Sequence, residues 1–179
     1  MLFRSVNVGT SGAGSATHMT LARFNAATGA NITHVPYRGG GALIPDLLSG
    51  AITGAMTELS TVMGHVGGGK VRVLGVASAK RSPQIPDAPT MIEQGVKDFT
   101  AASYVGILAP AATPAEIVKR LEAALTKALN DKGLQQKMLA SGAELVPDEL
   151  MTSAGFAAFI KREFEQTREA ARSAGLSPS

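Results

Sequence analysis

The chain has 179 residues, of which 45% are hydrophobic and 17% are charged, a balance typical of a globular protein rather than a disordered one. The net charge of +3 comes from scattered basic residues, so the concentrated basic surface that binds nucleic acid is not expected. The sequence has no cysteine, which excludes disulfides and thiolate metal sites, and no apolar run long enough to cross a membrane. Twenty glycines and 4% aromatic residues favour an α/β fold with many tight turns.

The first half of the chain predicts strands and helices in alternation. The expected strands cover residues 6–8, 32–36, 51–56 and 71–77. The expected helices cover residues 15–28, about 41–50 and about 60–66, each ended by glycine. Strands that alternate with helices of this length indicate βαβ units on a mostly parallel sheet.

After a loop with three prolines at residues 80–89, the pattern changes. Residues 101–108 form an apolar run that predicts a long strand, and nearly everything beyond it is expected to be helical. Thr113, Pro114 and Glu116 have the spacing of a capping box with the favoured proline at the first helical position.

Two apolar stripes follow at helical spacing. The residues in them are Ile117, Val118, Leu121 and Leu125, then Phe156, Phe159, Ile160 and Phe164. One strand for three helices cannot complete a sheet, so partner strands are expected to be missing from this tail.

The turn from Gly9 to Ser15, with the sequence GTSGAGS, is a candidate anion site. It lies between a predicted strand and a predicted helix, where backbone N–H groups and the helix dipole attract negative charge. Thr10, Ser11 and Ser15 add hydroxyl donors without adding charge. A flexible turn in which Ser15 caps the helix is the alternative, and the spacing leaves both open.

More specific motifs fit this turn less well. A nucleotide-binding P-loop needs lysine where Ser15 stands, and the dinucleotide fingerprint needs glycine where Thr17 stands. A nucleophile elbow is nearly matched at Ser11, and the order Ser11, Asp46, His65 would suit a hydrolase triad. The three histidines lack metal-binding spacing, so neither a metal site nor a cofactor is expected.

Two further turns follow the next two predicted strands. The first contains Tyr37, Arg38 and Gly39, and the second begins with Thr57 and Glu58. Turns after parallel strands fall on one edge of the sheet, so the three turns predict a pocket for a small anion. Arg38 would be either its counter-charge or a solvated loop cation. Glu58 would repel a carboxylate and is expected to face away or to bond to backbone.

Four stretches of the sequence, at residues 8–18, 34–52, 70–96 and 102–114, resemble the tripartite tricarboxylate transporter receptor family, also called Bug receptors. The resemblance implies an α/β fold of the type II periplasmic-binding-protein kind, in which two lobes close on a ligand. Residues 6–97 would then form one complete βαβ lobe, the second lobe of the family. Residues 98–179 would supply the crossover strand and C-terminal helices of the first lobe. About 100 residues of that first lobe would be missing, so the chain is expected to be truncated at its N-terminus.

The family holds its ligand through backbone amides and hydroxyl groups, which implies a set of candidate residues here. They are Ser11, Gly12, Gly14, Ser15, Tyr37, Arg38, Gly39, Ser103, Tyr104 and Gly106, and the turns themselves add Thr10 and Thr57. The family often has Asp-Asn where this chain has Thr57-Glu58, which leaves the identity of the ligand open.

The resemblance implies a periplasmic receptor without enzymatic activity. It would capture a small organic carboxylate, such as a di- or tricarboxylate, an amino acid or an aromatic acid. Its expected partners are the membrane components of a tripartite tricarboxylate transporter or a sensor, with no nucleic acid and no insertion into the membrane. The alternatives are a serine hydrolase that uses Ser11, and an interaction module without a ligand.

Overall fold

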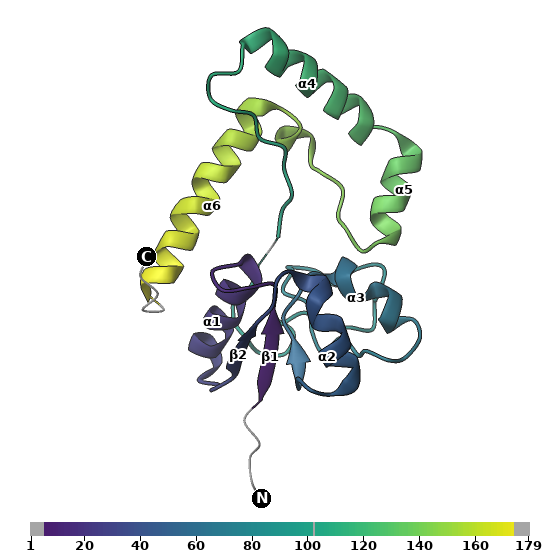
Figure 1. Ribbon diagram of the computed structural model, residues 1–179, viewed down its shortest axis with the longest axis vertical. Helices are drawn as coiled ribbons and strands as arrows, with labels where there is room; N and C mark the ends of the chain where they lie inside the picture. Colours follow the sequence, from purple (N-terminus) through teal and green to yellow (C-terminus); the bar gives the residue numbers. More distant parts are fainter. Residues whose placement is uncertain (1–5, 102, 174–179) are drawn as a thin grey trace, which may run out of the picture. The chain divides into compact units, whose positions relative to one another are not determined.

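The structure is a computed structural model that describes residues 6–101 and 103–173 (Figure 1). The chain divides into two compact units. The first comprises Met1–Ser103 and Ala170–Ser179, and the second comprises Tyr104–Glu169.

A parallel sheet lies at the centre of the first unit. Its strands are β1 (Asn7–Thr10), β2 (Thr33–Pro36) and β3 (Gly54–Ala55), in the order β2-β1-β3. In the register, Val8 lies between His34 on one side and Gly54 on the other. This confirms the α/β class and the parallel βαβ arrangement, although β3 is shorter than the strand predicted over residues 51–56.

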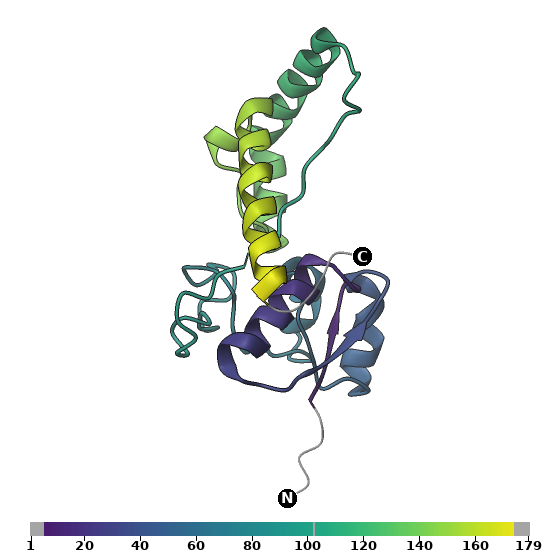
Figure 2. The same cartoon turned by 90° about the vertical axis from the view of Figure 1, so that its left-hand side faces the viewer.

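Helices follow each strand of the sheet. They are α1 (Ala16–Thr28), the 3-10 helix η1 (Gly40–Leu43) with α2 (Ile44–Ser49), and α3 (Leu59–Val66). The chain moves from β1 to β2 on one side of the sheet and then returns past β1 to β3 on the other side. Because both crossovers are right-handed, this change of direction places α1 and α2 on opposite faces of the sheet. Figures 1 and 2 show this arrangement. The reversal creates a topological switch point at the carboxyl end of β1.

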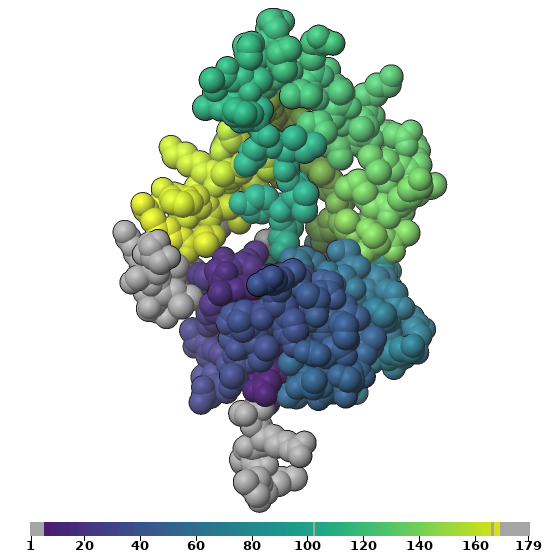
Figure 3. All heavy atoms as spheres, viewed as in Figure 1, coloured from purple at the N-terminus to yellow at the C-terminus, as the bar shows by residue number. Residues whose placement is uncertain are grey.

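The core of the first unit is apolar and reaches from the sheet to the end of the loop that follows α3. Its buried hydrophobic side chains belong to Val8, Leu21, Leu43, Ile52, Val62, Ala88 and Phe99. The ring of Phe99 meets the ring of Phe24 edge-on, with centroids 5.9 Å apart. In Figure 3, spheres of residues 6–66, purple to blue, pack closely together.

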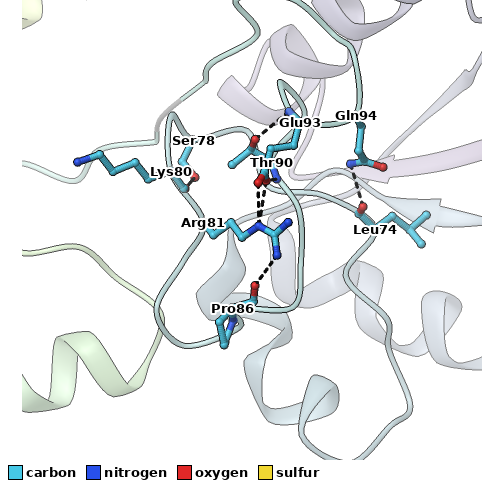
Figure 4. A network of polar contacts seen from close by, with 8 residues as sticks. All are labelled: Leu74, Ser78, Lys80, Arg81, Pro86, Thr90, Glu93 and Gln94. Carbon is cyan, nitrogen blue, oxygen red and sulfur yellow. Dashed lines mark hydrogen bonds and ion pairs between the residues drawn. The ribbon is translucent and has the colours of Figure 1, made fainter.

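A polar network holds the loop between residues 78 and 94 (Figure 4). Arg81 Nε lies 3.0 Å from both carboxylate oxygens of Glu93, and its Nη1 donates to the Pro86 carbonyl. Thr90 and Glu93 bond reciprocally, each backbone N–H donating to the other side chain. The hydrogen bond from Arg81 is the main cause of a lowered pKa of Glu93, and the bond from the Thr90 N–H is the second cause. The network replaces regular secondary structure as the constraint on this loop.

The fourth strand predicted over residues 71–77 is wrong. Only Val76 pairs there, through a single parallel bridge to Thr90. The long strand predicted over residues 101–108 is also wrong for its described residues, and Val105 is 99% exposed. An extended run becomes a strand only when a neighbour takes its backbone hydrogen bonds along several residues. Here the backbone bonds stop at Val76, which pairs with Pro89 and Met91, and at Ala77, which accepts from the Ala101 N–H.

The second unit is helical. Its elements are α4 (Ala115–Leu129), α5 (Lys132–Ala140), the 3-10 helix η2 (Asp148–Leu150) and most of α6 (Ser153–Ser173). The backbone N–H and the hydroxyl of Ser153 both donate to Glu122 on α4, and these bonds lower the pKa of Glu122. No described side chain of Tyr104–Glu169 is buried, and Figure 3 shows the atoms of α4 and α5 at the surface.

The capping box predicted at the start of α4 is wrong. Pro114 is the N-cap, with extended torsion angles, and no side chain caps the helix. The helix therefore begins one residue later than expected, which moves Thr113 away from the free N–H groups. Glu116 pairs with Lys119 at 3.1 Å instead of reaching back.

Candidate functional site

Three turns meet at the carboxyl edge of the sheet, as the parallel strands require. The Gly39 N–H donates to the Ser11 carbonyl at 3.1 Å, which joins the first turn to the second. The Tyr37 N–H donates to the Thr10 carbonyl, also at 3.1 Å, and the Met56 N–H donates to the Gly9 carbonyl at 2.9 Å. The first and second turns, and the end of β3, are therefore one connected surface at the switch point.

Two hydroxyls of the first turn have structural roles. The Thr10 side chain is fully buried, and its Oγ1 lies 2.7 Å from His34 Nε2. Ser15 is the N-cap of α1, because its Oγ accepts from the His18 N–H at 3.2 Å and donates to the Gly12 carbonyl at 2.7 Å. The interpretation of Ser15 as a cap is therefore confirmed, and Thr10 Oγ1 is occupied inside the fold.

The amide donors of the first turn are not those expected from its glycines. The Gly12 N–H donates to Thr10 Oγ1, and the Gly14 N–H donates to His18 Nδ1 at 3.0 Å. The exposed N–H groups of Ala13 and Ala16, in contrast, make no hydrogen bond to another described residue. Ala16 is the first residue of α1, where a free N–H adds to the positive end of the helix dipole.

Gly12 keeps the first turn close to the second. Its φ of 134° is rarely adopted by residues with a side chain, and a Cβ there would lie 3.0 Å from the Tyr37 carbonyl oxygen. Glycine is needed at this position for the approach of two backbones.

The second turn is held by its tyrosine and offers amides from its glycines. The Tyr37 hydroxyl donates a hydrogen bond to Asp46 Oδ2 at 2.6 Å. This bond is the main reason why the pKa of Tyr37 is raised. Arg38 is exposed and makes no ion pair with a described residue. The N–H groups of Gly40 and Gly41, at the start of η1, have no partner among the described residues.

The third turn brings a carboxylate into the group. Glu58 Oε2 accepts from Ser11 Oγ at 3.4 Å and from Thr57 Oγ1 at 3.3 Å, and its Oε1 accepts from Ser103 Oγ at 3.3 Å. The expectation that Glu58 faces away or bonds to backbone is wrong, because three hydroxyls hold its side chain at the ligand edge. Glu58 comes three residues after the end of β3, in a turn at the same edge of the sheet as the other two turns.

Two histidines stack beneath the first turn. The rings of His18 and His34 lie 3.8 Å apart and are nearly parallel. The pKa of His34 is lowered, mainly because its ring is partly buried and secondly because of electrostatic repulsion from His18. His18 Nδ1 accepts a hydrogen bond from the Gly14 N–H at 3.0 Å. The His18 ring therefore links the histidine pair to the first turn.

The remaining candidates lie in the second unit. Tyr104 is 48% exposed, and its ring meets Phe156 and Phe159 edge-on, with centroids 6.3 and 4.9 Å away. Gly106 lies two residues further along the same extended segment. Their assignment to a ligand site stays a prediction.

The hydrolase alternative has no geometric support. Ser11 Oγ bonds to Glu58, while Asp46 bonds to Tyr37 and His65 lies in the last turn of α3. Within the described residues, no group of three acidic or histidine side chains could hold a metal ion, and no helix is long and apolar enough to cross a membrane.

Comparisons with known proteins agree on one family. Residues 4–176 match the tripartite tricarboxylate transporter family receptor. Protein BugT of Bordetella pertussis is 33% identical over 139 residues, which are 76% of this chain and 43% of that protein. The structure of R. palustris Rpa4515 with adipate is 28% identical, with a TM-score of 0.87 over 98% of this chain and 58% of the other.

A third relative has a bound ligand of another kind. MatC from Rhodopseudomonas palustris with bound malate is 25% identical, with a TM-score of 0.83 over 92% of this chain and 56% of the other. The chain thus spans about half the length of these relatives. It belongs to the tripartite tricarboxylate transporter receptor family and has the α/β fold of periplasmic binding proteins.

Proposed function

We propose that the protein is a periplasmic receptor that captures a small organic carboxylate and delivers it to a tripartite tricarboxylate-type transporter or to a sensor. The family match supports the receptor class. The adipate and malate in the two related structures support a carboxylate as the ligand. In this proposal residues 6–97 form a ligand-binding lobe, and residues 98–179 belong to the other lobe.

The observation that carries the proposal is the set of unpaired amides at the switch point. Ala13 and Ala16 offer N–H groups at the start of α1, and Gly40 and Gly41 offer them at the start of η1. Such amides bind a carboxylate through dipoles that need no counter-charge. In this mechanism the hydroxyl of Ser11, next to the first pair, holds Glu58 beside the site, and Arg38 contributes a secondary attraction from the surface.

Calorimetry on this chain tests the proposal with adipate, malate, citrate, glutamate and benzoate as ligands. We expect at least one of them to bind, more weakly than with micromolar affinity, because the chain spans only about half the length of its relatives. Ser11→Glu should weaken that binding at least about tenfold, because it fixes a second negative charge beside the amides.

Asn31→Glu is the control, since it adds the same charge in the exposed connection before β2, at the opposite edge of the sheet. It should leave the affinity unchanged. Equal binding by the wild type and Ser11→Glu would place the site elsewhere. A chain that binds neither these five ligands nor any other small carboxylate, zwitterions included, would refute the receptor proposal.

A further inference from the structure

Glu58 is an acidic side chain held inside a site for which an acidic ligand is proposed. Hydroxyl groups of Ser11, Thr57 and Ser103 donate to its two oxygens at 3.3–3.4 Å. These donors come from the first turn, the third turn and the segment after the long loop, so they fix the carboxylate from several directions. Hydroxyl groups are uncharged, so these three donors leave the negative charge of Glu58 in place. A carboxylate can accept about four hydrogen bonds, so one acceptor position of Glu58 stays available.

Within residues 6–101 and 103–173, no cation pairs with this carboxylate. Among the described residues, Glu58 forms no ion pair, and its side chain is half-buried. Arg38 lies on the second turn but is exposed and does not reach it. A partly buried charge without a counter-charge is stabilised when a ligand supplies the opposite charge on binding.

The charge of Glu58 acts differently on two kinds of carboxylate ligand. In this inference the ligand carboxylate lies against the Ala13 and Ala16 amides, and the other end of the ligand lies near Glu58, whose Oε2 is 3.4 Å from the hydroxyl of Ser11 in the same turn. A second carboxylate at that end would be repelled by Glu58, whereas an ammonium group would be attracted. The amides recognise one end of the ligand, and Glu58 selects the other.

We propose that Glu58 is the specificity-determining residue of the site and that it selects a zwitterion, a ligand with one carboxylate and one ammonium group, over a dicarboxylate of the same length. The ligand class is therefore an amino acid in the broad sense, with a single carboxylate at the amides. This inference rests on the proposed carboxylate-binding function and adds to it the charge of the ligand's second end.

Matched ligand pairs test the inference by calorimetry at pH 7 on this chain. The pairs are β-alanine with succinate, 4-aminobutyrate with glutarate, and 5-aminovalerate with adipate, so that only an ammonium replaces a carboxylate. In the pair with the fitting spacer, we expect the wild type to bind the zwitterion at least about tenfold more tightly. Equal affinities, or a preference for the dicarboxylate, would overturn the inference without any variant.

Glu58→Gln then assigns the selectivity to this residue. It keeps the size and the acceptor oxygen but removes the charge, so the preference should fall to within about threefold, chiefly because the dicarboxylate binds more tightly. Glu116→Gln, which removes the same charge from an exposed position on α4, should keep the wild-type preference. A Glu58→Gln variant with unchanged selectivity would overturn the inference while leaving carboxylate binding intact. Failure of all six ligands and of the earlier panel would instead refute the proposed function itself.

Discussion

The imidazole of His34, which stacks on the ring of His18, makes the stability of the chain sensitive to pH. Burial, and then the charge of His18, disfavours the protonated form of His34 and lowers its pKa below the usual 6.5. The folded chain therefore binds fewer protons than the unfolded chain just below pH 6.5. Stability must consequently decrease as the pH falls through that range towards the folded-state pKa of His34, and it is fully present above it.

The predicted result is a free energy of unfolding in urea that is lower at pH 5.5 than at pH 7.5. His34→Gln should reduce this difference, because it removes the titrating group but keeps a hydrogen-bonding partner for Thr10. His65→Gln on α3 serves as the control and should leave the difference as in the wild type. An unchanged pH dependence in His34→Gln would show that other groups cause it.

At residue scale, the sequence indicates the first turn because hydroxyls and glycines after a strand are a local signal, and the assignment of a ligand to that turn stays a prediction. Within the turn the sequence favours Gly12 and Gly14, but their amides donate to Thr10 and His18 inside the fold, while those of Ala13 and Ala16 make no bond to another described residue. The direction in which an N–H group points depends on the torsion angles of the turn, which residue types alone do not determine.

At the scale of elements, local signals predicted the helices well. The Ser15 cap and the Gly29 end of α1 act within a few residues, and both are confirmed. The strands predicted over residues 71–77 and 101–108 failed because a strand depends on a partner distant in the sequence. Apolar β-type residues are necessary for such a strand but do not show whether a partner is present.

Two variants, one at the start of α5 and one at the start of α4, test which of these helices is stabilised by a side-chain cap. Asp131 is the N-cap of α5 and accepts from the Leu134 N–H at 2.8 Å. Asp131→Ala should lower the free energy of unfolding by about 1 kcal/mol. Thr113→Ala is the control and should change it by less than about 0.5 kcal/mol, because Thr113 caps nothing. Urea unfolding followed by circular dichroism measures both, and an equal loss in the two variants would contradict the assigned caps.

At the scale of the whole chain, the buried core is concentrated in the first unit. The fully buried side chains Leu21 and Leu43 lie there, whereas the described residues of the second unit include none that is buried. Apolar residues of α4 such as Ile117 and Leu121 remain 43% and 46% exposed. Few buried contacts mean that local opening needs little free energy.

Hydrogen exchange should therefore separate the two units. We expect slow amides in β1, β2 and α1, and exchange that is faster by at least about a hundredfold in α4 and α5. Mass spectrometry of peptides after timed deuterium labelling measures the difference. Uniform protection along the chain would contradict this distribution of stability.

The most direct test of the ligand site is an amide map of binding by NMR. The ligand is 5-aminovalerate or adipate, whichever binds more tightly, titrated into ¹⁵N-labelled chain. We predict that the largest shift changes fall on the amides of Ala13, Ala16, Gly40 and Gly41. Changes confined to α4 and α5, or to the cavity lined by Val66, Arg72 and Pro86, would contradict the assignment of the site to the carboxyl edge of the sheet.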